Sequence, residues 1–191
     1  MFQETISNQE VNDLPLVRYE GRIQLIQKIE DAEKAAKILL NEKVLGFDTE
    51  SQPTFKKGDK HLPALIQLGT EECVYLFQLN HLKSIDWALP ILTNSDILKV
   101  GVALHDDIIE LQEYSHFIAA GFLNIPKMSQ NLGISNTGLR KLTAIILKSR
   151  VSKGSQVSNW GNRKLSVQQI QYAATDAWIS LKLYKKLLQY Q

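Results

Sequence analysis

The chain lacks the features that define several protein classes. Its 191 residues include a single cysteine, Cys73, so an intrachain disulfide and a zinc site built on paired cysteines are both excluded. No apolar stretch approaches the roughly 18 residues that a membrane-spanning helix needs. The N-terminal residues "MFQETISNQEVNDLP" have no basic segment followed by an apolar run, as a signal peptide would. These absences predict a protein of the reducing cytoplasm without membrane association.

The chain also has little excess charge of either sign. The formal net charge is +2, which is too small to indicate nucleic-acid binding by itself. The composition, 44% hydrophobic and 22% charged, is that of an ordinary globular protein. A chain of this length is expected to form one domain with a substantial core.

Hydrophobic periodicity predicts an α/β protein with a mixed β-sheet flanked by helices. Residues 1 to 20 are expected to form an irregular N-terminal arm, and residues 21 to 191 the single domain. The pattern alternates strands with helices, and a short turn joins two of the strands into an antiparallel hairpin. The expected strands cover 21 to 27, 44 to 48, 64 to 69, 73 to 78 and 96 to 104. The expected helices cover 31 to 42, with Asp31 as N-cap, then 85 to 94, and most of the chain after about 105.

The stretch "VLGFDTES", residues 44 to 51, ends a buried strand with two acids, Asp48 and Glu50. Side chains two positions apart on a strand point to the same face, so the two carboxylates repel each other and lose solvation. One interpretation is that Glu50 lies in a solvated loop and Asp48 caps a turn before Pro53. The other is that a divalent cation lies between them, since Mg²⁺ and Mn²⁺ prefer carboxylate oxygen.

A second acid position follows the strand "KVGVAL", where "HDD" begins a helix. Asp106 shares its helical row with Glu110 and Glu113, which predicts that it faces water as an N-cap or first-turn acid. Asp107 shares its row with Leu111, Tyr114 and Ile118, and is therefore expected to face inward. The alternative is that Asp107 merely caps the helix.

The last helix, with Ser166 as its expected N-cap, carries a third acid position. Asp176 lies in an apolar row, between the small residues Ala173 and Ser180, which leave space around the carboxylate. Tyr172 lies one turn earlier on the same face. A buried acid is rarely left uncompensated, so either a salt bridge or a ligand is expected there. Together, Asp48, Glu50, Asp107 and Asp176 suit a site for two divalent ions about 4 Å apart, as in phosphoryl displacement.

At this point a family resemblance is visible. "FDTES", "VGVALHDD" and "YAATDAW" resemble the three exonuclease motifs of the DEDD superfamily, which has the ribonuclease-H-like fold. A tyrosine four residues before the last aspartate is typical of its DEDDy branch. The similarity covers about residues 22 to 188 and includes "ALIQLGT", "GLRKLTAIIL" and "QVSNW". Within the branch, the chain is similar to the Werner syndrome exonuclease domain and to the catalytic domain of ribonuclease D.

The resemblance implies a metal-dependent enzyme that removes nucleotides from the 3′ end of nucleic acid. It implies that Asp48, Glu50, Asp107 and Asp176 hold two Mg²⁺ or Mn²⁺ ions, with Tyr172 at the attacking water. The segment "FIAAGFLNIPKMS" departs from the pattern, because it lacks an acid often found in this part of the family. Unlike full ribonuclease D, the chain is expected to lack a helical nucleic-acid-binding domain after residue 191, so substrate grip is expected from this domain or from a protein partner.

Two basic segments are candidates for contact with nucleic acid: "FKKGDKHLP" at 55 to 63 and "LKSRVSKGSQVSNW" at 147 to 160. Phosphate contacts would come from basic side chains, and Trp160 would offer a platform for a base. The alternatives are solvated loops and, for Trp160, a packing role in the core. Arg140 and Lys141 are expected on a solvated helix face. The predicted substrate-binding residues are Thr49, Lys57, His61, Lys153, Asn159 and Trp160.

Three functions remain open at this point. The first is a 3′-5′ exonuclease, with DNA slightly favoured over ribonuclease D-like trimming of RNA. The second is a nucleic-acid-binding module that keeps the fold without chemistry, against which all five motif residues argue. The third is a metal-dependent phosphohydrolase of small nucleotides. The sequence leaves the oligomeric state open.

Overall fold

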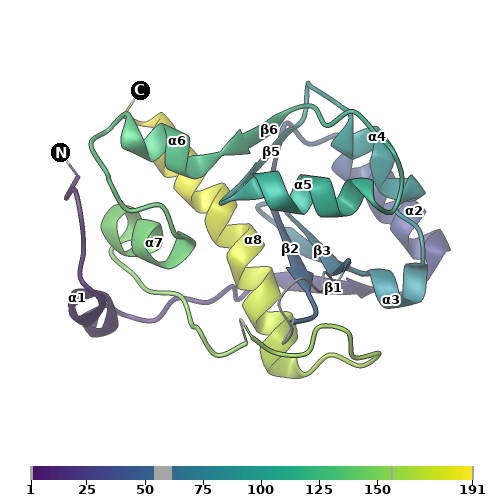
Figure 1. Cartoon of the computed structure of the whole chain (residues 1–191), viewed down its shortest axis with the longest axis horizontal. Coiled ribbons are helices and arrows are strands. Elements are labelled where there is room, and N and C mark those ends of the chain that lie inside the picture. Colours follow the sequence, from purple (N-terminus) through teal and green to yellow (C-terminus); the bar gives the residue numbers. More distant parts are fainter. Residues whose placement is uncertain (1, 54–61, 156, 191) are drawn as a thin grey trace.

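A six-stranded mixed sheet forms the centre of the molecule, in the order β1-β4-β3-β2-β5-β6 (Figure 1). The computed structural model describes residues 2 to 53, 62 to 155 and 157 to 190. Strand β2 pairs antiparallel with β3 and parallel with β5, and so joins the two halves of the sheet. The strands are β1 (Arg22–Ile26), β2 (Val44–Ser51), β3 (Pro63–Gly69), β4 (Cys73–Gln78), β5 (Leu98–Gly101) and β6 (Phe122–Asn124).

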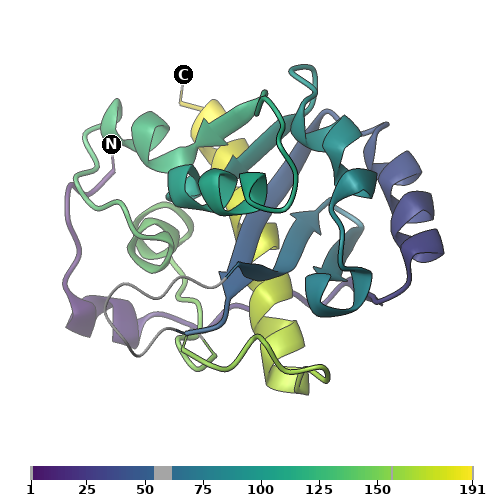
Figure 2. The ribbon, with the colours of Figure 1, turned by 45° about the vertical axis from the view of Figure 1, so that its right-hand side comes forward.

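Helices cover both faces of this sheet, which confirms the predicted architecture (Figures 1 and 2). One face packs on α2, the segment from α3 to α4, and α5, around Phe47 and Phe77. The other face packs on α8, with α6 and α7 beside it. The helices are α1 (Asn8–Asp13), α2 (Ile29–Leu39), α3 (Leu79–Leu82), the 3₁₀ helix η1 (Asp86–Ala88), α4 (Leu89–Leu92), α5 (Leu104–Gln112), α6 (Ile125–Gln130), α7 (Leu139–Leu147) and α8 (Val167–Leu188).

The long helix α8 lies unusually close to β2. A Cβ atom on Gly46 would lie 1.9 Å from the carbonyl oxygen of Ala177, so only glycine permits this approach. Ser166 begins the helix as predicted, with its hydroxyl accepting from Gln169 and the Gln169 side chain accepting from the Ser166 amide. The close packing brings Asp176, which precedes Ala177, next to the end of β2.

The N-terminal arm packs onto the domain. It contains α1, in which Val11 is fully buried, and its backbone pairs with Arg150 through Pro15 and Val17. Tyr19 is also buried, and its amide donates to the Thr175 hydroxyl on α8. The arm therefore contributes to the core beside α7 and α8, which the irregular sequence pattern did not predict.

Several predicted boundaries differ from the structure. Helix α2 begins at Ile29 with Lys28 as N-cap, so Asp31 lies in its first turn and pairs with Lys34. The predicted helix at 85 to 94 is divided into η1 and α4. Strand β6, only three residues long, lies where helices were expected, because so short a strand leaves no readable alternation. Among the described residues, no helix combines the length and the apolar character needed to cross a bilayer.

Candidate active site

Strand β2 and helix α8 bring three carboxylates together. Asp48 and Glu50 both point from β2 toward α8, as the alternation of side chains on a strand requires. Asp176 meets them from α8, and one carboxylate oxygen of each of the three lies within 4.8 Å of the others. This confirms the inward position predicted for Asp176 and favours the interpretation in which Asp48 and Glu50 act together.

Asp176 has no cationic partner in the described part of the chain. The residue is only 5% exposed, and no group among the described residues donates a hydrogen bond to its Oδ1 atom. The ion pairs seen among the described residues are Arg18–Glu20, Lys34–Asp31 and Lys185–Glu71. The salt bridge considered as an alternative at Asp176 is therefore not formed within the described part of the chain. A buried carboxylate oxygen without a donor fits a cation ligand.

Burial raises the pKa of every acid in this group, and the charges of neighbouring acids add to the rise for Asp48 and Glu50. Burial, followed by the charges of Asp176 and Asp107, raises the pKa of Glu50 to about 9. Burial raises the pKa of Asp176 to about 7, and the nearby Tyr172 hydroxyl opposes that rise. The pKa of Asp48 is raised well above its usual range by burial first, and then by the neighbouring acids. A divalent cation would remove this repulsion, and carboxylate oxygens are the ligands that Mg²⁺ and Mn²⁺ prefer.

Asp107 lies beside this group at the start of α5. The Thr49 hydroxyl donates to its Oδ1, and burial raises the pKa of Asp107 to about 6. Its charge in turn raises the pKa of Asp48 and Glu50, so Asp107 lies near them. Asp107 is not one of the three acids whose oxygens lie within 4.8 Å of one another. Asp106 is exposed in the first turn of the same helix, as predicted.

Two residues face differently from the prediction made from the helical rows of α5. The helix stops at Gln112, so Ile118 lies beyond it and is 81% exposed. Glu110 was expected to face water, but it is half-buried and accepts a hydrogen bond of 3.0 Å from the Ser51 hydroxyl. Helical spacing predicts which way a residue faces only within the helix. Even there, a neighbouring strand can partly bury a residue that the spacing places toward water.

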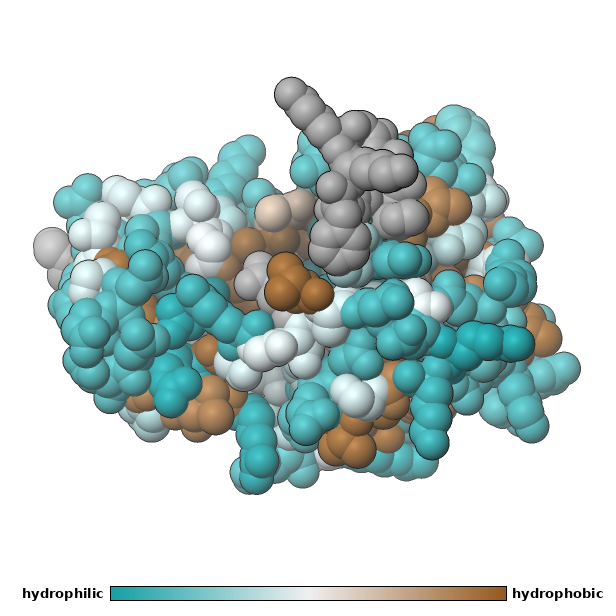
Figure 3. Space-filling model, turned by 60° about the horizontal axis from the view of Figure 1, so that its bottom comes forward, coloured by the Kyte–Doolittle hydropathy of each residue, from teal (hydrophilic) through white to brown (hydrophobic). Residues whose placement is uncertain are grey.

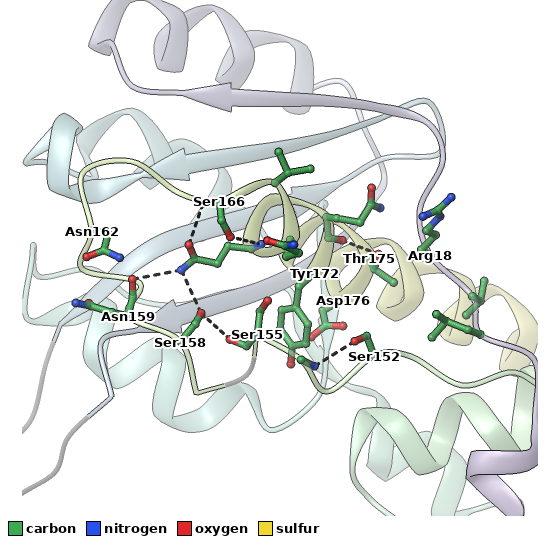
Figure 4. Close-up of a pocket in the computed structure, with 17 residues that line it drawn as sticks. Arg18, Ser152, Ser155, Ser158, Asn159, Asn162, Ser166, Tyr172, Thr175 and Asp176 are labelled. Atoms are coloured by element: carbon green, nitrogen blue, oxygen red, sulfur yellow. Dashed lines mark hydrogen bonds between the residues drawn. The ribbon is translucent and has the colours of Figure 1, made fainter.

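Tyr172 and Asp176 extend from α8 into the same space (Figure 4). Tyr172 lines a cavity of about 290 Å³ together with Asp48, Glu50 and Asp176. Burial, and then the charge of Asp176, raises the pKa of the Tyr172 hydroxyl, so the phenol keeps its proton. A protonated hydroxyl beside a carboxylate group can orient a water molecule.

A larger cavity, of about 610 Å³, adjoins the carboxylates and is shown in Figure 4. Its wall combines many uncharged polar side chains with a larger share of apolar surface. The Gln169 amide holds it in shape by donating to the Ser158 hydroxyl and to the carbonyl of Asn159. The lining includes Arg18 from the N-terminal arm, as well as Tyr172 and Asp176. Asn159, a predicted substrate-binding residue, therefore lines a cavity that extends to Asp176.

The other predicted substrate-binding residues have different positions. Trp160 is 1% exposed and packs at 6.1 Å, between ring centroids, from Tyr172, so it is a core residue and offers no exposed face to a base. Lys153 is exposed on a separate groove that also reaches Tyr172 and Asp176. Lys57 and His61 lie outside the described residues.

The sequence missed Arg140 and Lys141, which were expected on a solvated helix face. Both are half-buried and line the same groove as Lys153. No signal in the sequence could have found them, because their role depends on how α7 is oriented against α8. The periodicity of α7 predicts which face of the helix is buried. It does not predict which other segments pack beside the first turn of the helix.

Comparisons with known proteins identify the family of the chain and agree with its fold. A family model described as "3'-5' exonuclease" matches residues 23–190. The mouse "Bifunctional 3'-5' exonuclease/ATP-dependent helicase WRN" is 30% identical over 92% of this chain, which spans 13% of that protein. "Ribonuclease D" of Haemophilus influenzae is 31% identical over 73% of the chain, which spans 35% of it.

A solved structure, the Nibbler EXO domain of Aedes aegypti, superposes with a TM-score of 0.81. Its sequence identity is 23%, and the match covers 92% of this chain and 94% of that one, so the likeness concerns the fold. The chain belongs to the 3′-5′ exonuclease domain family. This confirms the predicted enzyme class and the ribonuclease-H-like fold.

Proposed function

We propose that the chain removes nucleotides from the 3′ end of nucleic acid by phosphodiester hydrolysis supported by two divalent cations, and that DNA is slightly favoured over RNA. The observation that carries the proposal is the meeting of Asp48, Glu50 and Asp176 within 4.8 Å, in the absence of a cationic partner among the described residues. Such a group is costly unless a cation binds to it.

In this proposal, the four acids would divide the binding of two metal ions between them. Asp48, Glu50 and Asp176 would hold one Mg²⁺ or Mn²⁺ ion, and Asp107 with Asp48 would hold the second. When bound, the ions would stabilise the negative charge on the phosphoryl group and on the leaving oxygen. Thr49 fixes the Asp107 carboxylate by its hydrogen bond, so that Asp107 faces the site before any ion arrives.

The Tyr172 hydroxyl would orient the attacking water. It lies in the cavity with the carboxylates, and its raised pKa keeps the hydroxyl protonated over the whole physiological range. The aromatic ring packs against Trp160, which limits the positions that the hydroxyl can take. The role assigned to Trp160 is therefore support of Tyr172.

The sugar and base of the 3′ nucleotide would lie toward the polar cavity beside Asn159. The amide of Asn159 and the surrounding serines can bond to either a ribose or a deoxyribose. Thr49 and Lys153 stay predicted substrate contacts, as do Lys57 and His61 beyond the described residues. A cytoplasmic site of action and a protein partner that helps to hold the substrate also stay predictions from the sequence.

The choice between DNA and RNA rests on the relatives. The similarity to the Werner-type protein covers 92% of the chain and that to ribonuclease D covers 73%, which favours DNA slightly. Trimming of RNA 3′ ends is the second candidate, because the identity to ribonuclease D, 31%, is no lower.

The test is degradation of DNA and RNA oligonucleotides labelled at either end. With Mg²⁺ or Mn²⁺, a 5′ label should appear in a ladder of shortening products, while a 3′ label should be released at once as a mononucleotide. EDTA should stop both. Release of the 5′ label first would contradict the direction. Hydrolysis of a mononucleotide ester without shortening of any oligonucleotide would favour a small-molecule phosphohydrolase. Binding without hydrolysis under any metal would favour a silent binding module.

A further inference from the structure

A second groove, of about 320 Å³, reaches the acid site from the side of α7 and α1. It lies between the first turn of α7 and the segment from Val151 to Lys153, with Asn8 of α1 at its rim. Three cationic side chains line it: Arg140, Lys141 and Lys153. We call it the basic groove. Tyr172 and Asp176 also line it, so the basic groove borders the acid site.

The positive charges of the basic groove are not balanced within the described residues. The ion pairs found there involve none of the three side chains. Arg140 donates from Nη2 to Oδ1 of Asn12, a neutral partner, at 2.6 Å. Its buried Nε finds no acceptor in the part of the chain that the structure describes. A buried guanidinium nitrogen without an acceptor costs free energy, unless a ligand supplies one.

The arm helps to shape this groove. Helix α1 packs on α7, and the bond from Arg140 to Asn12 holds the guanidinium toward the rim. Gly138, the N-cap of α7, also lines the groove and provides no side chain to cap the helix. The partial positive charge of the helix N-terminus therefore adds to that of the cationic side chains. Figure 3 views the molecule from the bottom of Figure 1 and shows a largely hydrophilic face with smaller apolar patches.

We propose that the basic groove binds the phosphates of the substrate strand on the 5′ side of the scissile bond. This inference rests on the proposed function. An enzyme that releases the 3′ nucleotide must hold the remaining strand, and all of that strand lies on the 5′ side. The basic groove supplies cations next to the acids, which themselves repel phosphate. Arginine suits this role because its fork of donors matches phosphate oxygens.

The test compares two double variants that remove the same charge. Arg140→Gln/Lys141→Gln changes the basic groove. Lys34→Gln/Lys37→Gln is the matched control on α2, which packs on the opposite face of the sheet. Binding of a fluorescent single-stranded oligonucleotide would be measured in EDTA, where no cleavage occurs, over a range of salt concentrations.

The groove variant should bind on the order of tenfold more weakly than the wild type. The slope of log affinity against log salt should fall by about 0.7 for each phosphate contact that is lost. The control should keep both values. Lys153→Gln, at an exposed position that folding does not need, should lower the slope by the same amount per contact. Equal losses in the control and the groove variant, or no loss in the groove variants, would overturn the proposal.

A short substrate separates this proposal from the proposed function. The p-nitrophenyl ester of a nucleoside 5′-monophosphate has no strand on the 5′ side. In the groove variant, the ratio of kcat/KM for an oligonucleotide to that for the ester should fall on the order of tenfold, mainly through KM. An unchanged ratio would count against the groove. A wild type that hydrolyses neither substrate, but whose binding depends on Arg140 and Lys141, would overturn the proposed function alone.

Discussion

Buried ionisable groups lie at two places on the sheet. At one place the protein supplies hydrogen-bond partners for the group, and at the other it does not. On β5, Lys99 is fully buried, and its Nζ donates to the carbonyls of Asn94 and Ile97 at 2.7 Å each. The same nitrogen lies 5.1 Å from the centre of the Phe122 ring. At the end of β2, by contrast, Asp176 has an oxygen for which the described residues supply no donor, next to two further acids.

Burial shifts the pKa of the charged groups at both places, but only at Lys99 do groups of the protein itself satisfy the buried charge. Burial lowers the pKa of Lys99 to about 8, while its hydrogen bonds satisfy the ammonium group. Burial raises the pKa of Glu50 to about 9, and the acids around it add to the rise. A buried charge that finds partners in its own chain serves the fold. A group of buried like charges without partners is built for a ligand from outside.

The largest expected effect comes from removing one acid charge without changing its shape. In Asp107→Asn, the amide oxygen still accepts from Thr49, so the local structure should persist. An amide cannot supply the charge that a divalent ion needs. We expect nuclease activity to fall on the order of 10³-fold, equivalent to several kcal/mol of lost stabilisation. The measurement is the rate of shortening of a 5′-labelled oligonucleotide.

Asp106→Asn is the matched control, because Asp106 is exposed in the same helical turn. It should lose at most about 1 kcal/mol of helix stabilisation and stay active. An inactive Asp106→Asn beside an active Asp107→Asn would mean that the acids of α5 have been assigned in the wrong order.

The next effect separates the hydroxyl of Tyr172 from the metal ligands. Tyr172→Phe keeps the ring against Trp160 and removes only the group that would orient water. Turnover should fall on the order of 10²-fold. Stabilisation of the protein by Mn²⁺ in thermal melting should persist, because no carboxylate is lost. A fully active phenylalanine variant would exclude Tyr172 from the mechanism.

The sequence predicted the part of the site that depends on local periodicity. The alternation of β2 placed Asp48 and Glu50 on one face, and the helical rows of α8 placed Asp176 inside the core. Ser166 was recognised as the N-cap from its side-chain chemistry alone. Each of these inferences uses residues within a few turns of one another, where backbone geometry fixes the facing.

What the sequence could not predict depends on packing between distant segments. The burial of Trp160 follows from its place under Tyr172, and a tryptophan in a loop reads equally well as a platform or as an anchor. Arg140 gains its position from α1, 128 residues earlier in the chain. The buried Lys99 was not noticed, because its partners are backbone carbonyls, which every residue has.

A smaller effect concerns stability and its dependence on pH. Folding raises the pKa of Asp176 from 3.8 to about 7 and that of Glu50 from 4.5 to about 9. The folded state therefore binds more protons than the unfolded state between these values, so stability is greatest at low pH and falls as pH rises toward 9. Without metal, the melting temperature should decline from pH 5 to pH 9.

Saturating Mn²⁺ should reverse this decline, by about 2.7 kcal/mol at 100 times its dissociation constant. Asp176→Asn should flatten the pH dependence and weaken the response to Mn²⁺, since it removes both the repulsion and a ligand. Differential scanning fluorimetry of the two proteins across pH, with and without the ion, gives the measurement. A melting temperature at pH 8 that ignores saturating Mn²⁺ would argue against a preformed site.

The smallest effect should come from substituting Lys99. Unlike the substitutions of the acids, it should change stability and leave activity unchanged. Lys99→Met removes the ammonium group and leaves the carbonyls of Asn94 and Ile97 buried without a donor, which costs about 1–3 kcal/mol. Relief from burying a charge offsets part of that cost. We expect a net loss of about 1 kcal/mol in urea unfolding, with kcat/KM unchanged for the folded enzyme.

The stability difference between the wild type and Lys99→Met should depend on pH. Folding lowers the pKa of Lys99 from 10.5 to about 8, so the wild type gains stability as pH rises through that window and loses it as pH falls. The methionine variant cannot titrate there, so its deficit should grow from pH 8 to pH 10. Glu50→Gln should do the reverse of Lys99→Met: it should stabilise the metal-free protein and abolish its activity. A Lys99→Met variant that is fully folded but inactive would contradict the purely structural role of Lys99. Lys99 would then influence the acid site through the sheet.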